Sequence, residues 1–338
     1  MKLAVLIAIL ILIPMHGNAA ETQGFLFAAE MIAPANQIGT AGHYRIPGMP
    51  GELVPLQIKV TNHTDQIVEV KFVPMNAYAS QTGIFYQNPN DVNTQAYSLL
   101  DSRFGLAQYM TVPESLDLQP NDIQIVDFSV AVPDIDTGTL LGCIRVIAFA
   151  GTQTALETDT KVDSAQMLID KYQAVDTAIE IILPNPATPS ISVGEVTFLG
   201  EKIAVGVQIT NQAALIQENI TGQYEIKDNQ NTVLFSDVIE KFKMSPMSTF
   251  NYPLTWQNKT LEPGTYALSL TLHVGDEVID VRRDITIDAQ GVDEAQRTQQ
   301  RISPTIKSTQ FQWYEVALQV LILIIIVLFI AFIRKKRR

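Results

Sequence analysis

The sequence predicts an all-β protein, built from two tandem β-sandwich domains and followed by a single transmembrane helix. Three observations lead to this fold class: apolar and polar residues alternate over many short stretches, turn signals separate those stretches, and one long apolar run stands near the C-terminus. The 338 residues suffice for about two domains. With 47% hydrophobic and 17% charged residues, the chain can bury two cores, which excludes a wholly disordered protein.

The N-terminus has the order of regions that is typical of a secretory signal peptide. Lys2 precedes an apolar run over residues 3–13, and small residues follow as far as Ala19 and Ala20. The run has 11 residues, so a helix there is too short to cross about 30 Å of hydrocarbon. We therefore expect a signal peptide over residues 1–20, cleaved near Ala19 or Ala20.

Residues 21–152 are expected to form the first β-domain. Apolar residues alternate with polar ones over residues 56–60 and again over 68–72, which predicts a hairpin of two half-buried strands. Another alternating strand covers residues 126–132. Residues 140–149 are apolar on both faces apart from one arginine, as expected of a central strand.

A second domain, an immunoglobulin-like β-sandwich, is expected over residues 179–288, after a polar linker over residues 153–178. Short alternating strands follow one another there, separated by turns such as Pro263-Gly264 and Gly275-Asp276. One short repeat links the two domains, since Ile-Lys-Val-Thr-Asn at 58–62 resembles Val-Gln-Ile-Thr-Asn at 207–211. The expected strands cover residues 179–183, 193–199, 203–209, 224–226, 250–256, 266–272 and 281–287.

The C-terminal region predicts a membrane anchor. After a polar stalk over residues 289–312, a transmembrane helix is expected over residues 313–333, because residues 316–333 are 18 in number and almost wholly apolar. Such a helix covers about 27 Å. The residues expected at the membrane interface are Trp313 and Tyr314, and those expected in the cytoplasmic basic tail are Arg334, Lys335, Lys336, Arg337 and Arg338. The predicted localisation is the cell membrane, with a single pass and the bulk of the chain outside the cell.

The external part is strongly acidic. Without Lys2 and the five terminal cations, 17 basic residues face 35 acidic ones, a formal charge of about −18. Such a surface repels polyanions, so nucleic acid is excluded as a partner and any wall polymer must be bound by shape and hydrogen bonds. The single cysteine, Cys143, excludes an intramolecular disulfide and is expected to be a buried, unreactive thiol.

Motifs for catalysis or cofactor binding do not stand out. The sequence has no nucleophile elbow, zinc-protease motif, P-loop or dinucleotide-binding glycine pattern. Asp134 and Asp136 lie beside Gly138 as in part of a calcium loop, but the remaining ligands are missing and a solvated turn is the better interpretation. We expect no catalytic residue, no metal and no cofactor.

Aromatic residues are the main candidates for ligand binding. Six of them lie in the long irregular segment between the first expected hairpin and the strand at 126–132, where ring faces can stack on sugars or anchor peptides. Alternatively, half or more of them plug the open end of the sandwich. The six candidates are Tyr78, Phe85, Tyr86, Tyr97, Phe104 and Tyr109.

Several motifs, taken in their order along the chain, resemble the WxL-interacting proteins of Gram-positive bacteria. Ala77 to Tyr86 is similar to that family's Ala-x-x-x-x-x-Gly-x-x-Tyr strand pair, and residues 138–144 resemble the glycine-rich closing strand of its first domain. Further similar segments are Pro34, Asn36-Gln37, Tyr44, Pro50-Gly51 and residues 56–62 in the first domain, and residues 244–252 and 261–266 in the second.

The resemblance implies a non-catalytic surface protein at the Gram-positive cell wall. Its first domain would bind peptidoglycan, and its second would bind WxL-type surface proteins or a host ligand. Two other classes stay open. A wall-active, glycan hydrolase-like enzyme would need acidic residues clustered in a cleft, whereas an accessory subunit of a membrane sensor or transporter would need coupling through the predicted helix.

Overall fold

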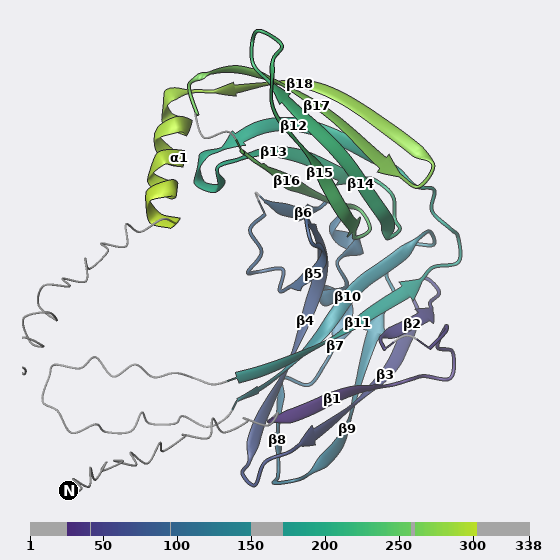
Figure 1. Cartoon of the computed structure of the whole chain (residues 1–338). Helices are drawn as coiled ribbons and strands as arrows, with labels where there is room; N and C mark the ends of the chain where they lie inside the picture. Colours follow the sequence, from purple (N-terminus) through teal and green to yellow (C-terminus); the bar gives the residue numbers. More distant parts are fainter. Residues whose placement is uncertain (1–25, 41, 95, 150–171, 258–260, 303–338) are drawn as a thin grey trace, which may run out of the picture.

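The computed structural model describes residues 26–40, 42–94, 96–149, 172–257 and 261–302, which form two lobes (Figure 1). Within these ranges no helix is long and apolar enough to cross a membrane. The predicted signal peptide, transmembrane helix and basic tail lie outside them, as do Ala19, Ala20, Trp313 and Tyr314.

The first domain is a sandwich of two β-sheets. One sheet contains, in spatial order, β1 (Phe27–Ile32), β3 (Leu53–Asn62), β9 (Ile123–Ala131) and β7 (Met110–Thr111). The other contains β2 (Tyr44–Pro47), β11 (Tyr172–Ile182), β10 (Thr139–Phe149), β4 (Val68–Ser80) and β5 (Gly83–Gln87), with β8 (Ser115–Leu118) paired to the start of β4. The alternating apolar residues of both sheets fill the core between them.

The alternation predicted in β3 and β4 is present, but the predicted hairpin is wrong. β3 pairs with β1 and β9, whereas β4 pairs with β10, β5 and β8, so the intervening turn carries the chain from one sheet to the other. Alternation indicates which face of a strand is buried and leaves its pairing partner open. The predicted central strand is confirmed, because β10 lies between β4 and β11.

The second domain begins later than the expected residue 179. β11 pairs along its whole length with β10, and its last four residues pair in parallel with β2. Residues 172–178, expected in the linker, are therefore strand, and residues 179–182 belong to the first domain. The boundary was misplaced because β11 follows a polar segment and is only weakly alternating in its first half.

The second domain is also a sandwich, as predicted. One sheet contains β12 (Ile191–Leu199), β13 (Ala204–Asn211), β16 (Ser248–Thr255) and β6 (Tyr97–Leu99). The other contains β15 (Val233–Met244), β14 (Gln217–Lys227), β17 (Gly264–Val274) and β18 (Glu277–Ile287). The sequence did not predict β15, whose pairing with β14 shifts register three times and whose apolar residues do not alternate regularly.

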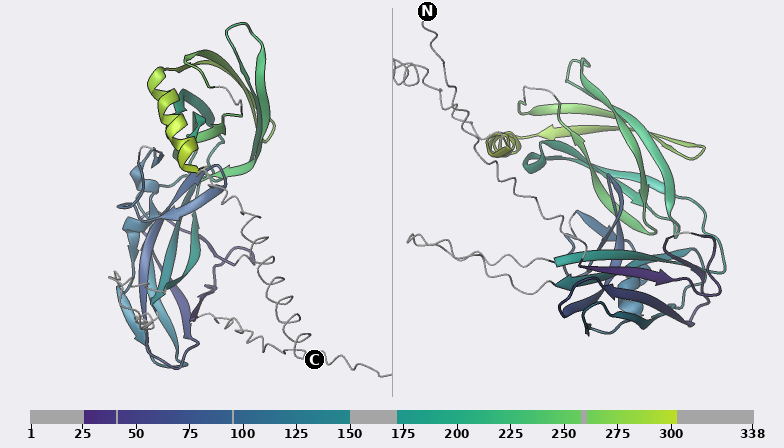
Figure 2. Two further views of the ribbon diagram at one scale, coloured as in Figure 1. Left: turned by 60° about the vertical axis from the view of Figure 1, so that its left-hand side comes forward. Right: turned by 60° about the horizontal axis from the view of Figure 1, so that its bottom comes forward.

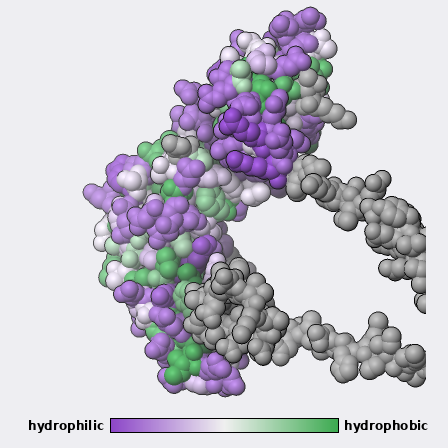
Figure 3. Space-filling view, turned by 90° about the vertical axis from the view of Figure 1, so that its left-hand side faces the viewer, coloured by the Kyte–Doolittle hydropathy of each residue, from purple (hydrophilic) through white to green (hydrophobic). Residues whose placement is uncertain are grey.

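The expected polar stalk starts with a helix, α1 (Ala289–Ile302). The Asp288 carboxylate caps its first turn by accepting a hydrogen bond from the backbone N–H of Gly291 at 2.7 Å. Val292 and Ala295 are buried against the second domain, while most of the helix surface is polar. Figure 3, which looks onto the side of the molecule that carries α1, shows mainly hydrophilic residues over this upper lobe. Two apolar contacts are too few to give a visible helical stripe in the sequence.

The repeat predicted from the two Thr-Asn segments has a structural counterpart. Asn62 ends β3 and Asn211 ends β13, and both side chains are buried. Each Nδ2 donates to the carbonyl four residues ahead, at 2.7 Å to Gln66 O and 2.8 Å to Leu215 O. Each Oδ1 accepts from the backbone N–H two residues ahead. The two asparagines therefore close equivalent strand ends in the two domains.

Replacing Asn211 with alanine is expected to destabilise the protein by about 2–4 kcal/mol, because one buried carbonyl, one partly buried carbonyl and one buried N–H lose their partner. Chemical denaturation of the variant measures this loss. Asn229, which is exposed in a turn, provides the control, since its replacement with alanine should change the stability by less than about 0.5 kcal/mol. Equal stabilities for the two variants would contradict the role given to Asn211.

Two segments of the first domain complete the second domain. β4 pairs with β10 as far as Asn76 and then continues with β5 toward the other lobe, so that Ala79 lies in the core of the second domain. β6 pairs with β16 at the edge of a second-domain sheet. Figures 1 and 2 show these blue strands reaching the green lobe. The two sandwiches therefore share structure and form one unit.

Candidate functional site

The two domains meet at a tight backbone joint. Gly138, with a φ of +98°, approaches the second domain so closely that a Cβ there would lie 2.0 Å from the carbonyl oxygen of Ala214. Its neighbour Thr139 donates its N–H to that oxygen at 2.7 Å, and the Gly138 N–H donates to Asn185 O at 2.7 Å. Asp136 accepts a hydrogen bond from the Asn185 side chain at 3.1 Å. Asp136, which the sequence predicted to lie in a solvated turn rather than a calcium loop, thus binds Asn185 at the contact between the domains.

A cleft of about 880 Å³ lies beside this joint, between the two domains. The first-domain wall comes from the segment before β2, from β2 itself and from the end of β11; the second-domain wall comes from the start of β14 and the end of β15. Clefts between domains are common positions for ligand sites. The cleft is lined by Ile38, Gly39, Thr40, His43, Arg45, Gly138, Thr139, Glu180, Ile182, Leu183, Pro184, Asn185, Pro186, Ala187, Leu215, Ile216, Glu218 and Lys243.

The first-domain wall of the cleft carries a fixed group of charges. Glu180 is only 8% exposed, and its carboxylate lies 3.1 Å from Arg45 Nε and 3.6 Å from His43 Nε2. Glu180 and Arg45 are register partners in β11 and β2, so the sheet itself holds them together. A half-buried ion pair continues this row toward β10, where Arg145 binds Asp176 through two nitrogens at 2.6 and 2.7 Å.

The second-domain wall carries charges that are not paired. Lys243 and Glu218 are exposed in the cleft, and neither forms an ion pair with any residue that the structure describes. The cleft therefore presents a free cation and a free carboxylate opposite a prearranged Arg45–Glu180 pair. Such an arrangement suits a ligand that carries both signs of charge.

The six aromatic candidates do not form one site. Tyr78, Phe85 and Tyr97 form a cluster, with ring centroids 5.7 Å apart for the tilted first pair and 4.9 Å for the edge-to-face second pair. Tyr78 is 4% exposed, and Tyr97 packs against the second-domain core. These three rings therefore fill the contact between the domains. Their placement is closer to the alternative in which the aromatic residues close the open end of the sandwich than to a ligand site.

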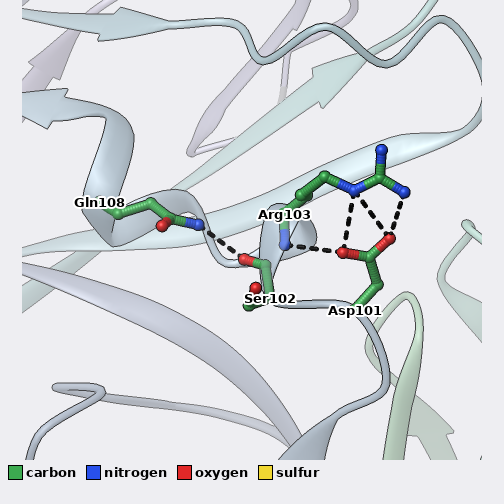
Figure 4. A network of polar contacts seen from close by, with 4 residues as sticks. All are labelled: Asp101, Ser102, Arg103 and Gln108. Atoms are coloured by element: carbon green, nitrogen blue, oxygen red, sulfur yellow. Dashed lines mark hydrogen bonds and ion pairs between the residues drawn. The ribbon is translucent and has the colours of Figure 1, made fainter.

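Phe104 and Tyr109 belong to the first-domain core and its edge. Phe104 is buried at the end of η1 (Ser102–Phe104), and Tyr109 ends η2 (Leu106–Tyr109). Figure 4 shows what holds this segment: Arg103 binds the Asp101 carboxylate, and Gln108 Nε2 donates to the carbonyl of Ser102 at 2.6 Å. The hydrogen bonds from Arg103 lower the pKa of Asp101 below its usual value.

Tyr86 is the aromatic candidate that lies close to the charges. It is half-buried on the sheet face that also carries Asp176 and Glu180, and burial raises the pKa of its phenol, with the nearby Cys143, Asp176 and Glu180 adding to the effect. Cys143 itself is buried, as predicted, and burial raises the pKa of its thiol. Burial therefore favours the protonated forms of the Tyr86 phenol and the Cys143 thiol beside the ion pairs.

Sequence reasoning missed the residues that line the cleft. Arg45, Glu180, Glu218 and Lys243 come from four separate strands, and nothing in the sequence around them indicates that they lie close together. The one available signal was Glu180, a charged residue inside an otherwise apolar run. Among the described residues, no group of three or more histidine, cysteine, aspartate or glutamate side chains is placed to hold a metal ion.

The structure thus defines a two-domain β-sandwich protein with a charged cleft at its joint. Two family models match it: the peptidoglycan binding domain of the WxL Interacting Protein over residues 27–148, and the host binding domain of the same protein over residues 184–297. The chain belongs to the WxL-interacting protein family. The second match begins directly after β11 and ends within α1, in agreement with the boundaries seen in the structure.

Several solved structures are similar to this chain at low sequence identity. The class 5 fimbriae chaperone CfaA is 14% identical, with 72% of this chain and 96% of that chain covered and a TM-score of 0.28. The E. coli chaperone DraB is 12% identical, with 78% and 98% covered and a TM-score of 0.31. A PapD-like domain of human CEP192 is 13% identical, with 46% and 85% covered and a TM-score of 0.25. Among curated proteins there is no match.

Proposed function

We propose that this protein is a non-catalytic scaffold of the Gram-positive cell surface, whose first domain binds peptidoglycan and whose second binds a WxL-type surface protein or a host ligand. The observation that carries the proposal is the match of the two domains, in order, to a peptidoglycan binding domain and a host binding domain. The shared strands support it, because a rigid joint holds two binding surfaces in a fixed relation. Both surfaces can then act together in one assembly.

The proposal includes an anchor in the cell membrane. Its support is the sequence alone: a signal-like N-terminus over residues 1–20, an apolar run over residues 316–333 within the predicted transmembrane helix, and a basic tail over 334–338. In the source cell, a chain truncated after residue 302 should leave the membrane fraction and be found in the wall fraction or the medium, whereas the full chain should stay in the membrane fraction. Equal amounts of the two forms in the membrane fraction would contradict the anchor.

Sedimentation with isolated peptidoglycan sacculi tests the wall-binding function. The purified external segment, residues 21–302, should pellet with sacculi in a saturable manner, and the pelleted fraction should persist at high salt because an acidic surface gains nothing from simple charge attraction. Failure to pellet at saturating sacculi would contradict the proposal. Release of soluble muropeptides during the incubation would favour the wall-active enzyme instead.

A further inference from the structure

We propose that the cleft between the two domains binds the peptide part of the wall polymer, as a short peptide carrying both a free amine and a free carboxylate. This inference rests on the proposed wall-binding function and assigns it a position and a ligand class. The cleft, at about 880 Å³, lies within the range of ligand sites and is large enough for several peptide residues.

The lining of the cleft favours a peptide over a sugar chain. Sugar rings are commonly bound by stacking on aromatic faces, and none of the described lining residues is phenylalanine, tyrosine or tryptophan. Instead, the lining combines aliphatic side chains such as Ile182, Leu215 and Ile216 with charged ones. A peptide with short side chains and charged ends matches both parts of this surface.

Both walls of the cleft carry charged groups that could bind the carboxylate and the amine of a zwitterionic peptide. On the first-domain wall, Arg45 Nε lies 3.1 Å from the Glu180 carboxylate, while the Arg45 side chain remains 45% exposed and is open to a ligand. The planar guanidinium group can bind a carboxylate through two nitrogens. On the opposite wall, Lys243 offers a second cation, and Glu218 offers an acceptor for an amine.

The cleft forms only when the two domains are joined. Lys243 and Glu218 come from the domain matched as host binding, whereas Arg45 and Glu180 come from the first domain and its last strand. Lys243 also lies against the tip of the β4–β5 hairpin, where its Cγ would be 3.6 Å from a Cβ built on Gly83. Peptide binding in the cleft therefore links the wall-binding domain to the position of the second domain.

Competition for sacculus binding tests the proposal with the full chain in detergent. The competitors are a soluble wall-type pentapeptide, with a free lysine amine and a free terminal carboxylate, and chitotetraose as a neutral sugar. The pentapeptide should displace the protein, whereas chitotetraose should not. Displacement by chitotetraose alone, or by neither competitor, would contradict peptide binding in the cleft but not wall binding itself. If the protein does not bind sacculi at all, the proposed wall-binding function is wrong.

Charge-neutralising variants test the cleft itself. Lys243→Gln and Glu218→Gln should each weaken pentapeptide binding roughly tenfold, the loss expected for one charge-assisted hydrogen bond. Lys241→Gln, an equal change on the same strand outside the cleft lining, should leave the affinity unchanged. All three side chains are exposed, so unchanged thermal unfolding can be verified for each variant. Equal affinities for the Lys243 and Lys241 variants would overturn the assignment.

Discussion

Replacing Gly138 with alanine is expected to destabilise the protein by about 3–5 kcal/mol. The φ of +98° is strained for any residue with a Cβ and costs about 1–3 kcal/mol. The new Cβ would also meet the Ala214 carbonyl oxygen at 2.0 Å, so the joint must open, which adds the cost of overpacking. Denaturant unfolding of the variant measures the total loss in the free energy of unfolding.

Gly51 is the matched control for this prediction. Its φ of +76° is also positive, but a Cβ built there has no heavy atom within 4 Å. Gly51→Ala should therefore show only the backbone cost, about 1–2 kcal/mol. If the two variants lose the same stability, the contact between Gly138 and the second domain does not hold the joint as described.

Replacing Ala79 with aspartate should unfold the second domain, although Ala79 lies on a strand of the first. The side chain is fully buried in the second-domain core, where an unpaired carboxylate costs several kcal/mol. The emission of Trp256 reports the result, because this residue lies in the same core and is the only tryptophan in a chain that ends at residue 302. We expect its emission to shift to the red in the variant without denaturant.

Ala131, which is exposed at the end of β9, provides the control for this experiment. Ala131→Asp should leave the Trp256 emission and the unfolding midpoint nearly unchanged. A native-like Trp256 spectrum in the Ala79 variant would contradict the shared core, and two well-separated unfolding transitions in the unmodified protein would do the same.

The sequence predicted the class of the fold because alternation of apolar residues is a local property. β9, β10, β16 and β17 were all recognisable from period two or from a continuous apolar run. Pairing was not predictable in the same way, since β3 and β4 have equivalent patterns yet lie in different sheets. The strand β6, three residues long, gains its conformation from β16 and has no signal of its own.

The cleft was not predictable for a related reason. Arg45 and Glu180 are 135 positions apart in the chain, and a parallel pairing of β2 with β11 brings them together. The aromatic residues were visible as a group, and the structure places three of them in the contact between the domains and Phe104 in a core. Of the six candidates, Tyr86 remains beside the charged row.

Hydrogen exchange on the full chain, with and without the soluble wall-type pentapeptide, tests the central claim most directly. Peptide binding in the cleft should slow exchange in the segments that line it, residues 38–40, 43–45, 182–187 and 215–218, because they lie in both walls. Exchange should not change in β17 and β18, which contribute no residue to the lining of the cleft. Protection confined to strands away from the joint, or no protection at a peptide concentration that displaces the protein from sacculi, would contradict the account.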